Sequence, residues 1–152
     1  MHCLSGKVWD LPETTAQRVF KSFEAKAGPA MKRDIERIHE KTRVKLPAAV
    51  VDFYTQLGWG EGFCSKTNPN AHYLVLNSPD AICNSWSTDF PHNFIPIGSD
   101  GAGEFIVVSS TGECGLLPMI SNYKEDYHFV AHSFEAFLGK AETGAWFEAA
   151  NS

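Results

Sequence analysis

The segment Phe94-Ile-Pro-Ile-Gly98-Ser-Asp-Gly-Ala-Gly103-Glu-Phe-Ile-Val-Val108 holds three glycines and an aspartate between two β-branched runs. A phosphate-binding glycine loop needs a helix directly after it, because the helix N-terminus supplies the N–H groups that face the phosphates. Here the following run, Phe105 to Val108, has the composition of a strand. The segment therefore predicts two antiparallel strands joined by a tight turn, with Asp100 and Gly101 as the turn pair.

The sequence before this hairpin predicts three helices. The first follows Leu11-Pro12, runs from Glu13 to Ala27 and ends at Gly28-Pro29. The second runs from about Ala30 to Thr42, with apolar residues at helical spacing on one side and charges on the other. The third follows Leu46-Pro47 and ends at Gly58. Its apolar positions at helical spacing are Val50, Phe53, Tyr54 and Leu57.

The sequence from Trp59 onward predicts short strands and two further helices. Residues 59–70 are rich in Gly, Asn and Pro and predict an irregular connection. Strands are expected at 73–76, 94–97, 104–109, 114–119 and 127–131, Ser78 is expected to cap a short helix, and Ser133 a final one. This order predicts an α+β fold, in which N-terminal helices pack on one central, mostly antiparallel sheet and a C-terminal helix closes the domain.

The composition is that of one globular domain of 152 residues, with 43% hydrophobic and 20% charged residues. No apolar run approaches the length that spans a bilayer, and the N-terminus lacks the apolar core of a signal peptide, so a cytoplasmic protein is expected. The cysteines have long, irregular spacings, which predict reduced thiols in place of disulfides or a zinc site. They are Cys3, Cys64, Cys83 and Cys114.

The net charge of −5 is unevenly distributed, with +3 in residues 1–58 and −8 in residues 59–152. An acidic half disfavours nucleic acid and anionic membrane as partners, because both require Lys and Arg. It suits a basic protein partner, although an acidic surface also simply keeps a protein soluble. If they share a face, the carboxylates expected to bind such a partner are Glu61, Asp89, Asp100, Glu104, Glu125 and Asp126.

No set of residues in the sequence predicts catalysis, a metal site or a cofactor. His128 and His132 are four residues apart, but they fall on a predicted strand end, where this spacing does not bring two ligands together. Asp100, Gly101 and Glu104 lack the alternating ligands of a calcium loop. No serine lies in a Gly-x-Ser-x-Gly turn, and no carboxylate has a partner for acid–base work. The sequence therefore favours a binding protein over an enzyme.

Three motifs together resemble one known family, the SUKH superfamily, which includes yeast cell-wall synthesis regulators and many bacterial immunity proteins. They are a helix motif with Leu46, Pro47, Phe53, Tyr54 and Gly58, a hairpin motif with Pro96, Gly98, Gly101 and Gly103, and a closing helix with Phe134 and Phe137. The resemblance covers residues 31–140, so residues 1–30 are interpreted as an N-terminal helical extension and 141–152 as a tail, all within one compact domain.

The resemblance implies helices packed on one mixed sheet and motif residues whose role is structural. It implies a non-enzymatic protein that neutralises a cognate toxin, often a nuclease, by binding it. The alternatives are a regulatory or scaffold module that binds an endogenous protein, or a small-molecule-binding domain with its pocket beside the loop 98–103. Glu104 stands where the family usually has Asp. If that Asp contacts the turn backbone, the longer Glu104 side chain is expected to bind outwards.

Overall fold

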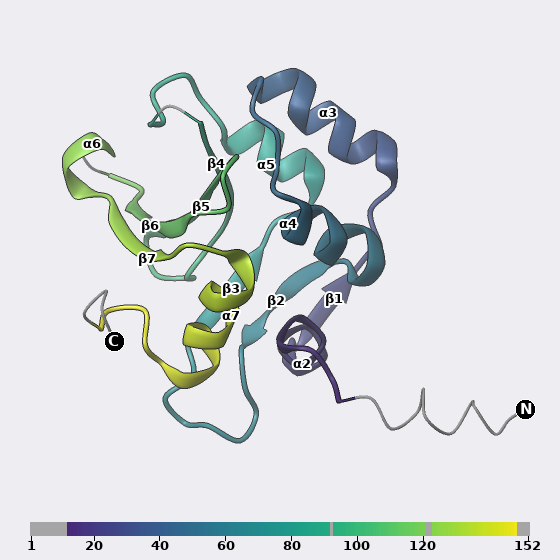
Figure 1. The fold of residues 1–152 in the computed structure, drawn as a ribbon, viewed down its shortest axis with the longest axis vertical. Coiled ribbons are helices and arrows are strands. Elements are labelled where there is room, and N and C mark those ends of the chain that lie inside the picture. Colours follow the sequence, from purple (N-terminus) through teal and green to yellow (C-terminus); the bar gives the residue numbers. More distant parts are fainter. Residues whose placement is uncertain (1–11, 92, 121–122, 149–152) are drawn as a thin grey trace, which may run out of the picture.

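The computed structural model describes residues 12–91, 93–120 and 123–148. Its centre is a seven-stranded sheet in which spatial order follows chain order and each neighbouring pair is antiparallel (Figure 1). The strands are β1 (Ala25–Ala27), β2 (Trp59–Phe63), β3 (Tyr73–Leu76), β4 (Phe94–Ser99), β5 (Glu104–Ser109), β6 (Cys114–Pro118) and β7 (His128–Ala131). The predicted α+β class is confirmed, and the sheet is antiparallel where the resemblance implied a mixed one.

The helices lie before, between and after the strands (Figure 1). They are α2 (Thr15–Ser22), α3 (Lys32–Thr42), α4 (Ala48–Asp52), the π-helical turn η1 (Phe53–Leu57), α5 (Pro79–Ser85), α6 (Tyr123–Asp126) and α7 (Phe134–Thr143). The predicted caps are confirmed, since the hydroxyl of Ser78 accepts the N–H of Ala81 and that of Ser133 accepts the N–H of Ala136. No helix within the described residues combines the length and apolar composition needed to cross a bilayer.

The predicted first helix, Glu13 to Ala27, is wrong at both ends. It begins after Thr14, whose side chain forms a capping box with Gln17, and it ends at Ser22. Residues Ala25–Ala27 form the edge strand β1, paired with β2. The backbone hydrogen bonds offered by β2 override the helical propensity of this alanine-containing segment.

The predicted irregular connection at 59–70 is also wrong in its first part, because Trp59–Phe63 forms β2. Its glycines allow the neighbouring backbone to come close. A Cβ added to Gly60 would lie 2.1 Å from the carbonyl oxygen of Ala25, and one at Gly62 would lie 2.8 Å from the Cα of Phe23. These glycines lie where two strands of the sheet come close together. A glycine-rich composition alone does not distinguish such a strand from a loop.

The hairpin of β4 and β5 is confirmed, but its turn is longer than an Asp-Gly pair. The connection spans Asp100 to Gly103, and the N–H of Asp100 donates to the carbonyl of Glu104 at 3.0 Å. The Asp100 carboxylate accepts the N–H groups of Ala102 and Glu104, at 2.8 and 3.0 Å. Gly101 and Gly103 have φ values of +76° and +106°, which favour glycine. Asp100 therefore makes the side-chain contact to the turn backbone.

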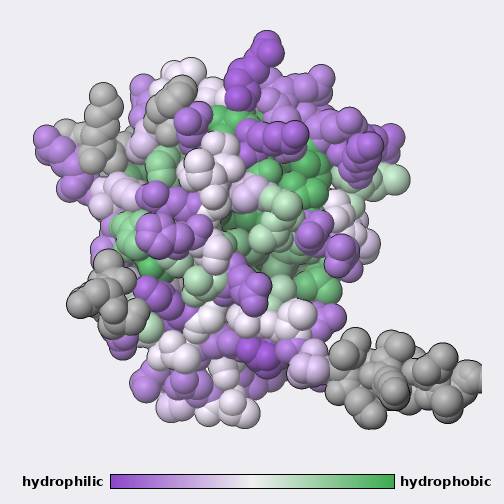
Figure 2. Space-filling model, in the orientation of Figure 1, coloured by the Kyte–Doolittle hydropathy of each residue, from purple (hydrophilic) through white to green (hydrophobic). Residues whose placement is uncertain are grey.

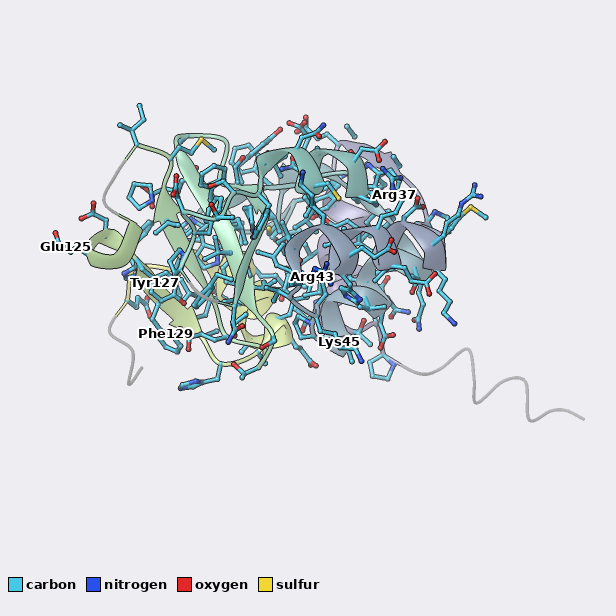
Figure 3. The ribbon with its side chains drawn as sticks, turned by 90° about the horizontal axis from the view of Figure 1, so that it is seen from above. Arg37, Arg43, Lys45, Glu125, Tyr127 and Phe129 are labelled. Atoms are coloured by element: carbon cyan, nitrogen blue, oxygen red, sulfur yellow. The ribbon has the colours of Figure 1, made fainter. Side chains whose placement is uncertain are left out.

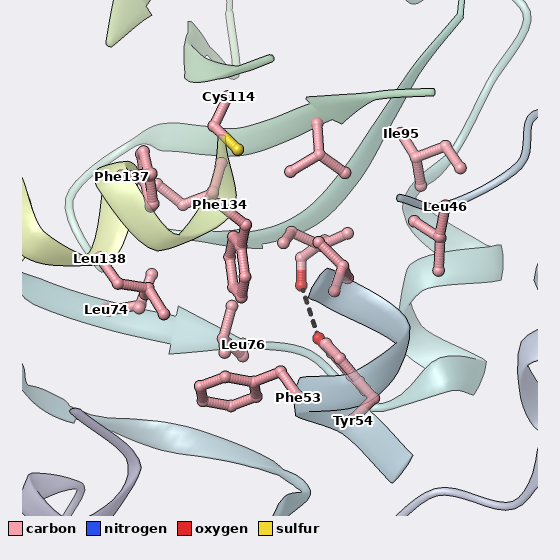
Figure 4. Packing of buried hydrophobic residues seen from close by; sticks show 14 of the residues in the cluster. Leu46, Phe53, Tyr54, Leu74, Leu76, Ile95, Cys114, Phe134, Phe137 and Leu138 are labelled. Atoms are coloured by element: carbon pink, nitrogen blue, oxygen red, sulfur yellow. Dashed lines mark hydrogen bonds between the residues drawn. The ribbon is translucent and has the colours of Figure 1, made fainter. Parts of the chain in front are cut away.

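The main core lies between the sheet and the layer formed by α2, α4, η1 and α7 (Figure 4). Tyr54 is fully buried, and its hydroxyl donates to the carbonyl of Asn77 at 2.7 Å. Burial raises the pKa of Tyr54 well above its ordinary range. The motif residues of this core are Leu46, Phe53, Tyr54, Phe134 and Phe137. A smaller cluster contains Val107 of β5, Leu117 of β6 and Phe90 from the segment between α5 and β4.

Candidate functional site

Four of the six predicted partner-binding carboxylates lie at one end of the sheet. We define the acidic sheet end as Asp100, Glu104, Glu125 and Asp126. Asp100 and Glu104 flank the β4–β5 loop, and Glu125 and Asp126 belong to α6, a short helix that the sequence did not predict. The strand register brings the two pairs together, because Glu104 lies opposite Pro118 at the end of β6.

The connection from β6 to α6 continues directly beside the β4–β5 loop. The N–H of Met119 donates to the carbonyl of Gly103 at 2.9 Å. The next residue, Ile120, is 97% exposed. An apolar side chain therefore lies in solvent next to the acidic sheet end.

The remaining two predicted carboxylates are not part of this group. Glu61 on β2 accepts the hydroxyl of Tyr73 at 2.5 Å. The Tyr73 ring lies against Gly101, since a Cβ added there would be 3.0 Å from it, so Glu61 lies at the margin of the acidic sheet end. Asp89 follows α5 and precedes the start of β4, and is therefore at the opposite end of that strand.

The carboxylates of the acidic sheet end influence one another. Partial burial raises the pKa of Glu104, the charges of Asp100 and Asp126 raise it further, and His128 lowers it. Like charges held this close favour the approach of a cation, which relieves their repulsion. Among the described residues, no group of three or more His, Cys, Asp or Glu side chains could hold a metal ion.

A histidine–aromatic cluster, which the sequence did not predict, supports this end of the sheet. The ring of His72 stacks on Trp146 with centroids 4.2 Å apart, and the ring of His128 stacks on Phe147 at 5.1 Å. The Nε2–H of His128 donates to the carbonyl of Trp146 at 2.8 Å. Residues 72, 128 and 146 follow no local spacing, so only the assembled sheet brings them together. Phe147 is 64% exposed and adds a second apolar contact point.

The acidic sheet end lies apart from the cationic side chains of α3 and the segment after it. Figure 3 shows Glu125, Tyr127 and Phe129 on one side of the molecule and Arg37 and Lys45 on another. Glu125 therefore lies apart from Arg37 and Lys45. Cys64, Cys83 and Cys114 are free thiols, and Cys3 lies outside the described residues.

The stability of the protein is expected to fall as the pH drops below about 6.5, the ordinary pKa of histidine. Burial lowers the pKa of His72, and its Nε2 accepts the N–H of Trp146 at 3.2 Å, which requires the neutral ring. Burial likewise lowers the pKa of His39, whose Nε2 accepts the N–H of Leu46 at 3.0 Å. Because the unfolded chain binds these protons more readily, stability is constant above that pH and declines below it.

The measurement is urea unfolding at pH 7 and pH 5 for the parent and for His72→Gln, whose amide oxygen accepts the same N–H without titrating. The loss of stability between the two pH values should be smaller in the variant. An identical loss in both proteins would mean that His72 is not linked to folding.

The chain matches the SMI1 / KNR4 family (SUKH-1) over residues 29–140. The match includes the helix motif from Leu46 to Gly58, the β4–β5 hairpin and all four residues of the acidic sheet end. It leaves out α2, β1 and the segment with Trp146 and Phe147. A search of curated proteins returned no significant match.

Proposed function

Because the chain belongs to the SMI1 / KNR4 family (SUKH-1), we propose that it is a cytoplasmic immunity protein. In this proposal it neutralises a cognate bacterial toxin of the nuclease type by direct binding, without catalysis. The family includes proteins with immunity and related roles and is generally non-catalytic. The acidic sheet end is the surface that contacts the toxin.

One observation carries the choice of partner: the acidic sheet end combines crowded carboxylates with exposed apolar side chains. Nucleases bind phosphates and therefore carry basic surfaces. Carboxylates opposite such a surface accelerate encounter, and apolar contacts then slow dissociation. Partial burial and the charges of Asp100 and Asp126 raise the pKa of Glu104, and a cationic side chain of the partner placed beside it offsets this effect. Ile120 and Phe147 supply the apolar contacts.

The double variant Glu104→Lys/Glu125→Lys is expected to bind the toxin at least about 100-fold more weakly than the parent, since two attractions become repulsions. Parent and variant serve as bait in lysates of the host and of competing strains. Captured proteins are identified by mass spectrometry, and the captured nuclease is assayed with and without the parent. Asp100 is left unchanged because its carboxylate holds the β4–β5 loop.

The matched control is Glu40→Lys/Glu135→Lys, which makes the same charge change at exposed positions on α3 and α7. It should capture the same protein as the parent. Equal capture by the Glu104→Lys/Glu125→Lys variant would show that the acidic sheet end is not the binding surface. Capture of a host housekeeping protein in place of a basic nuclease would favour the regulatory or scaffold role.

A further inference from the structure

A groove of about 860 Å³ lies between α3 and α4, away from the loop 98–103 and from the acidic sheet end. Its floor is apolar and includes Ile35, Leu46 and Val51. Figure 2 shows apolar side chains gathered over this region, with polar side chains around them. The floor belongs to the main core, so the groove is a fixed part of the fold.

The two walls of the groove run in opposite directions. The N–H of Ala30, just before α3, donates to the carbonyl of Tyr54 at 2.8 Å. At the other end, the N–H of Leu46, just before α4, donates to His39 of α3 at 3.0 Å. The start of α3 therefore lies beside the end of the α4–η1 helix, and the later part of α3 lies beside the start of α4.

This arrangement orders the charges along the rim. Lys32 stands at one end of the groove, Glu36 and Asp52 flank its middle, and Lys45 stands at the other end. The charges of both Lys45 and Glu36 act on His39, which lines the groove between them. The ion pairs found among the described residues involve none of these four rim charges. The rim thus presents positive, negative and positive charge in succession above an apolar floor.

We propose that this groove binds an amphipathic helix of a partner protein, with apolar side chains facing the floor, carboxylates at both ends and a Lys or Arg at its middle. A helix repeats its contacts at i, i+3, i+4 and i+7, which places apolar anchors on one face and charges along its flanks. A small anionic amphiphile matches one lysine but leaves the central carboxylates unmatched. The acidic sheet end is not involved, so this surface serves a second contact whichever partner that end binds.

The test uses two designed helical peptides of about 16 residues, long enough to be helical when bound. Both carry leucines at i, i+3, i+4 and i+7. The matched peptide has Glu at its ends and Lys at its middle, and the reversed peptide has each charge inverted. Fluorescence anisotropy at low salt should show the full chain binding the matched peptide at least about tenfold more tightly.

Two sets of variants separate the groove from the rest of the surface. Ala48→Trp fills the groove and should abolish binding, whereas Ala49→Trp, on the other side of α4, should leave it unchanged. The variant Lys32→Glu/Glu36→Lys/Lys45→Glu/Asp52→Lys should prefer the reversed peptide. Absence of binding, equal affinity for both peptides, or binding of dodecanoate but of neither peptide would overturn the proposal.

Discussion

Replacing Gly98 with alanine is expected to lower the free energy of unfolding by about 3 kcal/mol, the upper end for overpacking a buried site. An added Cβ would lie 1.8 Å from the carbonyl oxygen of Val75 on the adjacent strand. The pairing of β3 with β4 consists of Val75 with Ser99 and Leu76 with Gly98. Because the clash is with backbone, side-chain rotation cannot relieve it, and the two strands must separate.

The measurement is urea unfolding followed by tryptophan fluorescence and far-UV circular dichroism. Gly139→Ala is the matched control, since this glycine lies within α7 and a Cβ there meets nothing within 4 Å. It should raise the free energy of unfolding by about 0.5–1 kcal/mol, because alanine favours a helix over glycine. A Gly98→Ala protein with the parent's unfolding midpoint would contradict the close approach of β3 and β4.

Features of the fold that depend on residues close together in the sequence were predictable from the sequence. The caps at Ser78 and Ser133 depend on residues three positions away, and the strands of the β4–β5 hairpin depend on local composition. The edge strand β1 was not predictable, because the hydrogen bonds that define it come from β2, about 35 residues later in the chain. Gly60 and Gly62 carried a signal, but glycine marks loops and close-packed strands alike.

The candidate site was likewise predictable only where its residues are close in sequence. Asp100 and Glu104 are neighbours because a hairpin loop joins them, and the sequence placed that hairpin correctly. The approach of Glu125 and Asp126 depends on the register between β5 and β6, which a sequence pattern does not fix. The stacking of His72 on Trp146 joins the start of β3 to the segment after α7, and no local spacing indicates it. Nonlocal pairing is therefore the information that the single sequence lacked.

Replacing Trp146 with alanine is expected to lower the free energy of unfolding by about 3–5 kcal/mol, as for other large buried aromatic residues. The side chain is 1% exposed and stacks on His72 and on Phe137, with centroids 4.2 and 4.9 Å away. Its indole N–H donates to the carbonyl of Phe137 at 3.3 Å. The substitution leaves a cavity beside α7 and removes a donor from a buried carbonyl.

The neighbouring substitution Phe147→Ala separates folding from binding. Because Phe147 is 64% exposed, its removal should change the free energy of unfolding by less than about 0.5 kcal/mol. If the acidic sheet end contacts the toxin, the same variant should capture less of it.

Trp146 lies outside the family match of 29–140. A Trp146→Ala protein as stable as the parent in urea would show that the C-terminal segment folds independently of the core. A large loss would instead show that this segment, although it lies outside the family match, is part of the folded core.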